Sequence, residues 1–172
     1  DPASYNQFEA ASDPAQSRAL SGDIDRAGIG RQEEFATVYL VGDPSNPEQI
    51  ILPVRGQGLW GLMQGFLALE GDGNTIVGLS FYSHAETPGL GGEVDNPRWK
   101  AQWAGKKVYA DDPMQPEIEL VKGGADNEYE ADALSGATLT SRGVTNLLQF
   151  WLSENGFAPY LARFHDNSLG GA

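Results

Sequence analysis

The stretch Asp132-Ala133-Leu134-Ser135-Gly136-Ala137-Thr138-Leu139-Thr140-Ser141 places a small, hydroxyl-rich turn directly before a strongly amphipathic segment. In that segment apolar residues recur at the i, i+3, i+4, i+7, i+8 spacing of a helix packed on a core, and they are Val144, Leu147, Leu148, Trp151 and Leu152. The pattern predicts a helix over about residues 141–154, with Thr140 or Ser141 as its N-cap. The free backbone N–H groups at the start of this helix would face the turn, which we interpret as a phosphate-binding site.

A second informative stretch is Glu86-Thr87-Pro88-Gly89-Leu90-Gly91-Gly92-Glu93, followed by Asn96-Pro97-Arg98-Trp99. So many Gly and Pro residues exclude the interior of a helix or of a central strand. The stretch therefore predicts a shaped loop whose backbone can lie close to a flat ligand. Taken alone, each stretch also has a plainer reading, an ordinary helix cap and a surface turn.

Together the two stretches resemble known motifs. Asp132 and the Ser-Gly-Ala-Thr core resemble the flavinylation motif of the FMN-binding domain family, in which the last threonine carries FMN through a phosphodiester bond. The resemblance implies that Thr138 is the acceptor. With Ile51-Leu52-Pro53-Val54 and Gly58-Leu59-Trp60, the order of motifs from about Phe35 onward is similar to that of the C-subunit of bacterial sodium-translocating NADH:quinone reductases.

The residue patterns and the resemblance together predict a set of cofactor-binding residues around the FMN on Thr138. They are Ser135, Gly136, Ala137, Leu139 and Thr140 beside the acceptor, Glu86, Thr87, Gly89, Leu90 and Gly91 in the glycine-rich loop, and Trp60 and Lys122. Lys122 would place one positive charge near the phosphate or the ring, although a solvated lysine at a strand end is the plainer interpretation. No residue is expected to act as a catalytic group or a metal ligand.

The function implied is electron carriage within a membrane reductase complex. FMN on this chain would take an electron from an iron–sulfur centre between the membrane subunits and pass it to a second covalent FMN on the B-subunit, so the partners are the other subunits and a flavin transferase. Two alternatives stay open: the homologous G-subunit of an Rnf-type electron transport complex, and a periplasmic ligand-binding module without a redox role.

Composition limits the other possibilities. The chain has 172 residues with 24 acidic and 11 basic side chains, and its net charge of −13 repels nucleic-acid backbones. It contains no cysteine, so disulfides and iron–sulfur ligation are excluded within these residues. No run of eighteen apolar residues occurs. The resemblance implies a soluble domain on the periplasmic side of the bacterial inner membrane, with an N-terminal anchor that this chain lacks.

Two shorter motifs compete with this interpretation. The stretch Gly56-Gln57-Gly58-Leu59-Trp60-Gly61 matches the dinucleotide-binding pattern, but the turn at Asp72-Gly73-Asn74 leaves no room for the crossover helix that such a fold needs. The stretch His84-Ala85-Glu86 imitates part of a zinc deaminase motif, and without cysteine its further ligands are missing. We therefore expect neither site.

The coarse organisation predicted is an α+β fold with a mainly antiparallel sheet and packed helices, of the FMN-binding domain type. Residues 1–30 are expected to form a linker with a short helix over residues 13–21, and residues 31–172 the FMN-binding domain. Strands are predicted at 35–41, 49–55, 66–70, 75–81 and 117–122. Short helices are predicted after Pro97, with Trp99 and Trp103 in the core, and at 159–164.

Overall fold

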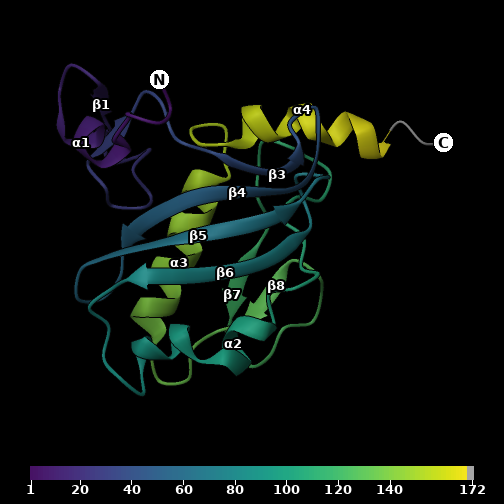
Figure 1. Ribbon diagram of the computed structural model, residues 1–172. Coiled ribbons are helices and arrows are strands. Elements are labelled where there is room, and N and C mark those ends of the chain that lie inside the picture. The colour runs from purple at the N-terminus through teal and green to yellow at the C-terminus, as the bar shows by residue number, and fades with distance from the viewer. Residues whose placement is uncertain (170–172) are drawn as a thin grey trace.

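The centre of the protein is an antiparallel sheet with one long helix packed against it (Figure 1). The fold is known from a computed structural model, which describes residues 1–169. The strands are hydrogen-bonded in the order β3-β4-β5-β6, and they are β3 (Tyr39–Asp43), β4 (Asn46–Gln57), β5 (Leu62–Glu70) and β6 (Ile76–Ser83). This combination of an antiparallel sheet with packed helices confirms the predicted α+β class.

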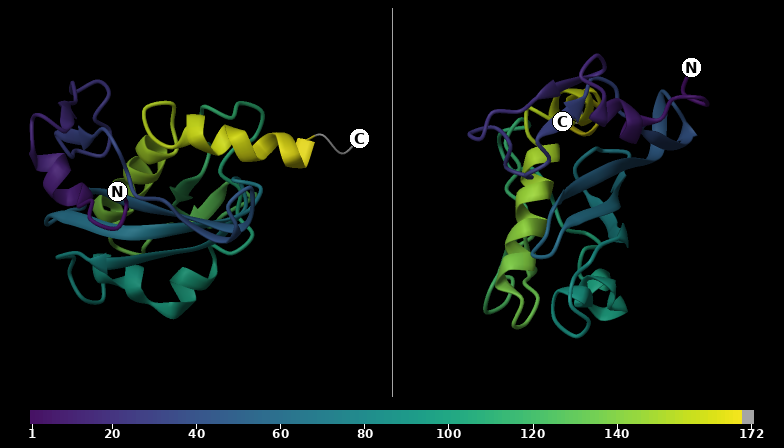
Figure 2. Two further views of the ribbon diagram at one scale, coloured as in Figure 1. Left: turned by 45° about the horizontal axis from the view of Figure 1, so that its top comes forward. Right: turned by 90° about the vertical axis from the view of Figure 1, so that its left-hand side faces the viewer.

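The two faces of the sheet differ because successive side chains of a strand point to opposite sides. Ile50, Leu52 and Val54 of β4 are buried in the core, as is Leu67 of β5, whereas Phe66 of β5 is exposed. The long helix α3 (Thr138–Trp151) covers the buried face, and Figure 2 shows it and the strands as two layers. The predicted strands at residues 49–55, 66–70 and 75–81 are confirmed, with bounds that differ at one or both ends.

The tight turn between β5 and β6 is also confirmed. Its residues 71–74 are held by the carboxylate of Asp72, which accepts hydrogen bonds from the backbone N–H groups of Asn74 and Thr75, both at 2.8 Å. Burial raises the pKa of this carboxyl, but the hydrogen bonds from Thr75 and Asn74 and the charge of Lys107 outweigh burial and lower the pKa below its usual value.

The helix α3 buries the predicted apolar stripe. It begins three residues earlier than residue 141, and neither Thr140 nor Ser141 is its N-cap, because both lie inside its first turn. The chain then turns into α4 (Ala158–Leu169), which is longer than the predicted helix at residues 159–164.

In the first 36 residues, the structure differs in two places from the predicted short helix over residues 13–21. A helix, α1 (Gln7–Ser12), lies before the predicted one, and it begins because the Asn6 side chain accepts hydrogen bonds from the N–H groups of the first turn. No helix covers residues 13–21. Instead, β1 (Ser17–Ala19) pairs antiparallel with β2 (Arg31–Glu33).

We call residues 1–36 the N-terminal lobe, and a buried ion pair connects it to the central sheet. Arg55 of β4 donates two hydrogen bonds to the Glu33 carboxylate, at 2.9 and 2.7 Å, and its guanidinium lies 5.0 Å from the ring centroid of Trp151 on α3. The expected boundary between residues 30 and 31 therefore falls between two paired strands, next to a buried ion pair.

The remaining elements close the end of the molecule where α3 begins (Figure 1). They are the 3-10 helix η1 (Gly91–Asp95), α2 (Pro97–Ala101), and the parallel pair β7 (Glu119–Val121) and β8 (Glu130–Asp132). No pattern in the sequence indicates β8. Trp103 is buried as expected, and Trp99 packs against the core cluster. The strand predicted at residues 35–41 begins only at Tyr39.

Candidate functional site

The turn before α3 brings Thr138 to the surface as the first residue of the helix. The Ala137 N–H donates to the Leu134 carbonyl oxygen at 3.2 Å, which closes the turn. Gly136 within it has a φ of +70°, a left-handed value that glycine adopts without strain. The hydroxyl of Ser135 is exposed in the same turn.

The start of α3 leaves hydrogen-bond donors without partners. Ala137 is the N-cap and has no side chain that can accept a hydrogen bond. Within residues 1–169, the backbone N–H groups of Thr138, Leu139 and Thr140 make no hydrogen bond. These groups and the positive end of the helix dipole favour a negatively charged ligand at Thr138.

The two hydroxyls predicted as N-caps serve the packing of the site. Ser141 Oγ accepts from the Leu134 N–H and donates to the Ala137 carbonyl oxygen, both at 2.9 Å, and so holds the turn onto the helix. Thr140 Oγ1 donates to Glu86 Oε1 at 2.8 Å. Both side chains are buried, so the structure does not place the Thr140 hydroxyl where a ligand can reach it.

Glu86 joins three segments of the chain. Its carboxylate is buried and accepts hydrogen bonds from the backbone N–H groups of Leu59 and Trp60, at 2.7 and 3.0 Å, in addition to the one from Thr140. The loops at 58–61 and 86–92 are thereby tied to the first turn of α3. Glu86 therefore connects the two loops to α3 from a buried position, whereas the sequence analysis predicted it among the cofactor-binding residues.

Two glycines make this close fit possible. A Cβ atom on Gly91 would overlap Thr140 Oγ1, and a Cβ atom on Gly58 would lie 2.6 Å from Glu86 Oε1. Gly89 differs, because its φ is +78° and nothing lies within 4 Å of the corresponding position. The structure therefore uses Gly91 to pack the loop against α3, and Gly89 to turn the loop.

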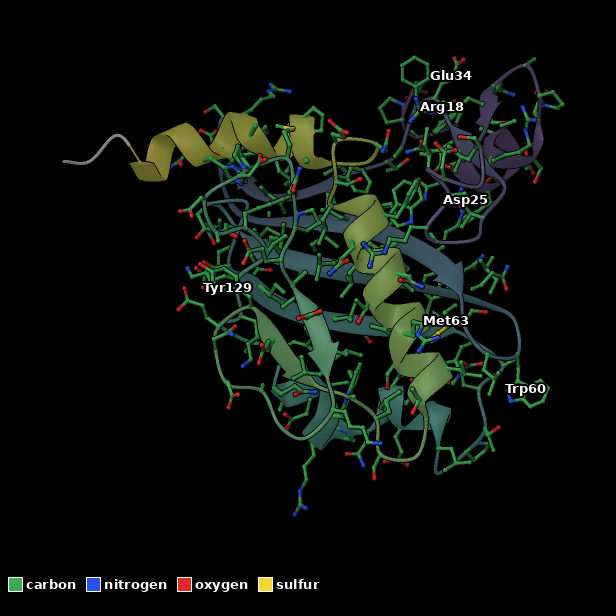
Figure 3. The ribbon with its side chains drawn as sticks, turned by 180° about the vertical axis from the view of Figure 1, so that it is seen from behind. Arg18, Asp25, Glu34, Trp60, Met63 and Tyr129 are labelled. Carbon is green, nitrogen blue, oxygen red and sulfur yellow. The ribbon has the colours of Figure 1, made fainter. Side chains whose placement is uncertain are left out.

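Exposed apolar side chains lie on these loops and on the first turn of α3. They are Leu59 (44% exposed), Trp60 (65%), Leu90 (46%) and Leu139 (52%). Trp60 Nε1 donates to Thr87 Oγ1 at 3.1 Å, which links the two loops. Figure 3 shows the Trp60 ring projecting away from the fold. This surface offers apolar contact to a flat aromatic ligand.

Thr138 also lines a cleft of about 590 Å³. Ser135 lines the same cleft, together with three cationic side chains from separate parts of the chain: Arg26, Lys122 and Arg142. The predicted Lys122 thus lines the same cleft as Thr138. The turn before α3 lies close to both motifs. Gly136 in this turn lines the cleft, and Leu90 of the glycine-rich loop has its Cδ2 atom 3.5 Å from the position that a Cβ atom on Gly136 would take.

The sequence interpretation missed two of these cations. Arg142 follows Thr138 by four residues, so the two share one face of α3, and this spacing could have indicated it. Arg26 comes from the N-terminal lobe, where its Nε donates to Asn146 Oδ1 on α3 at 3.1 Å. No local pattern in the sequence indicates this contact.

The two competing motifs lie in other structural settings. The glycines from Gly56 to Gly61 lie at and after the end of β4, which pairs antiparallel with β5, so no crossover to a parallel strand exists there. His84 Nε2 lies 2.7 Å from Asp95 Oδ2. Among the residues that the structure describes, no group of three or more His, Asp or Glu side chains is arranged to hold a metal ion.

Comparison with known proteins gives consistent relatives. Residues 58–153 match the model of the FMN-binding domain family. The chain is 52% identical over 167 residues to the C-subunit of the Na(+)-translocating NADH-quinone reductase of Pseudomonas aeruginosa, covering 94% of this chain and 64% of that protein. It is 49% identical to the corresponding protein of Vibrio anguillarum, covering 98% and 67%. The chain thus spans about two thirds of the length of these relatives.

Solved structures agree with the sequence relatives. The fold matches the crystal structure of NqrC from Shewanella oneidensis with a TM-score of 0.84 and 35% identity, over 98% of this chain and 76% of that one. The C-subunit from Parabacteroides distasonis matches with a TM-score of 0.60 and 31% identity, over 74% and 61%. Within the described part of the chain, no helix has the length and apolarity needed to cross a membrane. The chain therefore belongs to the FMN-binding domain family, as a homologue of the C-subunit of the Na(+)-translocating NADH-quinone reductases.

Proposed function

We propose that this chain carries FMN on Thr138 through a phosphodiester bond and serves as an electron-carrying subunit of a sodium-translocating NADH:quinone reductase. The observation that supports the attachment site best is the exposed hydroxyl of Thr138 at the first position of α3, beside three backbone N–H groups without partners among the described residues. Thr140 and Ser141, the nearest other hydroxyls in the helix, are buried and hydrogen-bonded.

The residues around Thr138 fit the parts of FMN. A phosphodiester keeps one negative charge, which the N–H groups at the start of α3 can stabilise. Leu59, Trp60, Leu90 and Leu139 offer apolar contact to the ring system. Bound FMN supplies one-electron chemistry, and the chain holds the cofactor in place and sets its surroundings. Because these side chains lie at the surface, an edge of the ring stays accessible to redox partners.

The proposed place in the complex is supported by the relatives of the chain. The C-subunit of the reductase is the named homologue along nearly the whole chain. We propose that electrons reach this chain from an iron–sulfur centre between membrane subunits and leave to a second covalent flavin on another subunit, on the periplasmic side of the bacterial inner membrane. The chain would then bind neither NADH nor quinone. A flavin transferase would attach the FMN from an activated flavin nucleotide: the Thr138 oxygen would bond to the FMN phosphorus, the bond from that phosphorus to the leaving group would break, and the hydroxyl proton would be released.

The test is the mass of the intact protein produced with and without a flavin transferase. We expect a mass increase of one FMN less one water only with the transferase, and flavin fluorescence that survives denaturation. Thr138→Ala should abolish both signals. The matched control is Ser135→Ala, which removes an exposed hydroxyl from the same turn and should leave attachment intact.

A different pattern would contradict the assignment. Covalent FMN in the Thr138→Ala protein, mapped by peptide mass to Thr140 or Ser135, would move the attachment site. Flavin that leaves the native chain on denaturation would favour a non-redox binding module instead. The G-subunit of an Rnf-type complex would show the same covalent flavin, and it would be distinguished by the partner proteins with which the chain assembles.

A further inference from the structure

We infer that Arg26, Lys122 and Arg142 form a phosphate-binding subsite that captures the phosphate of the flavin nucleotide and positions it at Thr138. The inference rests on the proposed attachment, and it assigns positioning roles to three side chains that lie outside the flavinylation motif. It also gives the N-terminal lobe, which precedes the matched residues 58–153, a part in the site.

The charge around the cleft is opposite to that of the whole chain. The protein has 24 acidic and 11 basic residues, yet among the described residues the cleft beside Thr138 is lined by three cations and by no carboxylate. A local excess of positive charge in a molecule of net charge −13 attracts an anion to this place, while most of the remaining surface repels it. The ligand indicated is therefore a small anion that reaches Thr138.

The cations of the cleft are also available to a ligand. Of the 11 Lys and Arg side chains, four make no hydrogen bond, ion pair or ring contact among the described residues, and they are Arg98, Lys100, Lys122 and Arg142. Two of these four line the cleft. Arg26 uses its Nε for Asn146 and keeps its two terminal amino groups for another acceptor.

The arrangement suits a phosphate more than a single carboxylate. Thr138 and Arg142 lie one helical turn apart on the same face of α3, and Lys122 and Arg26 approach the cleft from other segments. A phosphate monoester carries close to two negative charges and three acceptor oxygens at neutral pH. Several separate cations can satisfy these oxygens while the N–H groups at the start of α3 bind the same group.

The experiment compares FMN with riboflavin, which has the same ring but no phosphate, on the native chain before flavin attachment. We expect FMN to bind more tightly than riboflavin in titration calorimetry. The double variant Lys122→Ala/Arg142→Ala should lose FMN affinity by roughly threefold to tenfold and keep its riboflavin affinity, because exposed charge pairs make modest contributions of this size. Arg26→Ala should produce a smaller loss of the same kind.

The matched control is Arg98→Ala/Lys100→Ala, which removes the other two cations without partners in the described part of the chain and should leave both affinities unchanged. Equal affinity of the native chain for FMN and riboflavin would overturn the inference. So would a double cleft variant that binds FMN as the native chain does. Thermal unfolding of each variant checks that the chain is folded, and we expect all of them to unfold near the native temperature because none of these side chains is buried.

Covalent incorporation separates this inference from the proposed function. With limiting flavin transferase, the double cleft variant should incorporate FMN more slowly than the control variant. If Thr138 is modified at the same rate in both, the subsite is wrong and the attachment stands. If FMN binds in a manner dependent on the cations but no covalent flavin forms with the transferase, the attachment is wrong and the subsite stands.

Discussion

The two sides of Thr138 differ in how their polar groups are used. On the side of the glycine-rich loop, the Glu86 carboxylate accepts three hydrogen bonds, and Thr140 is a buried donor to it. On the side of the cleft, Lys122 and Arg142 have no partner among the described residues. The polar groups on the loop side are thus satisfied within the fold, while the cations on the cleft side are available to bind a ligand.

This difference separates the residues that form a motif from those that contact a ligand. The stretch from Glu86 to Gly91 stands out in the sequence, yet its carboxylate and one of its glycines serve the fit between loop and helix. The cations of the cleft belong to no motif. Substitution of a buried group on the loop side, such as Glu86, should therefore lower stability first, and substitution of a cation in the cleft should change binding alone.

The largest effect is expected for Glu86→Ala. The variant leaves the buried hydroxyl of Thr140 and the part-buried N–H groups of Leu59 and Trp60 without their acceptor. We expect the free energy of unfolding to fall by about 2–4 kcal/mol, since each unsatisfied buried group costs about 1–3 kcal/mol and relaxation recovers part of it. Urea unfolding measures the change.

The control for Glu86 is Glu34→Ala, which removes an exposed carboxylate and should change stability by less than about 0.5 kcal/mol. If both variants unfold at the same urea concentration, the Glu86 hydrogen bonds do not hold the site together. In that case the contrast between the two sides of Thr138 would lose its physical basis.

A smaller effect is expected for Gly91→Ala. The new Cβ atom would overlap Thr140 Oγ1 and lie 3.0 Å from Glu86 Cβ, so the loop must move away from α3. Overpacking of this kind costs about 1–3 kcal/mol of unfolding free energy, which urea unfolding again measures. The sequence alone favours a role for Gly89 and Gly91 in contacting the flavin more than in folding, and the structure revises that expectation for Gly91.

Gly89→Ala provides the comparison within the same loop. The added Cβ atom meets nothing within 4 Å, and only the left-handed φ of +78° opposes it. We expect a loss of about 1 kcal/mol from this backbone strain. A Gly91→Ala/Thr140→Ala double variant should recover part of the Gly91→Ala loss, because the closest atom is then gone. If the unfolding free energies lost in the two single variants simply add up in the double variant, the clash is not with Thr140.

These expectations show what the sequence could and could not indicate. The apolar stripe of α3 and the tight turn at Asp72 are predictable because they depend on spacing within a few residues. The start of α3 is not, because Thr140 bonds to Glu86 in a distant loop, and Ser141 bonds back to Leu134 and Ala137 in the turn before the helix. The local pattern favours both hydroxyls as caps, but the folded chain uses them for these contacts.

The prediction for the N-terminal lobe was wrong for a related reason. Its strands β1 and β2 have three residues each, too few for an alternating pattern, and their pairing joins positions such as Ser17 and Glu33 across a long loop. Arg26 illustrates the same limit at the site. Its place in the cleft depends on where this lobe docks on α3, and no stretch of sequence records that contact.

Among the loop-side variants, the smallest effect on stability and the sharpest test of the contrast are expected for Trp60→Ala. The indole is 65% exposed and makes one hydrogen bond, to Thr87, so its removal should lower the free energy of unfolding by no more than about 1 kcal/mol. If the ring of the flavin lies on the loop side, however, losing this aromatic contact weakens riboflavin and FMN equally, by up to about tenfold. The cleft variants should weaken the affinity for FMN alone.

Trp60→Phe is the matched control, because it keeps an aromatic face and loses only the bond to Thr87, and it should retain most of both affinities. A Trp60→Ala chain that binds riboflavin as the native chain does would place the ring away from the loops, and would leave the cleft as the site of the whole nucleotide.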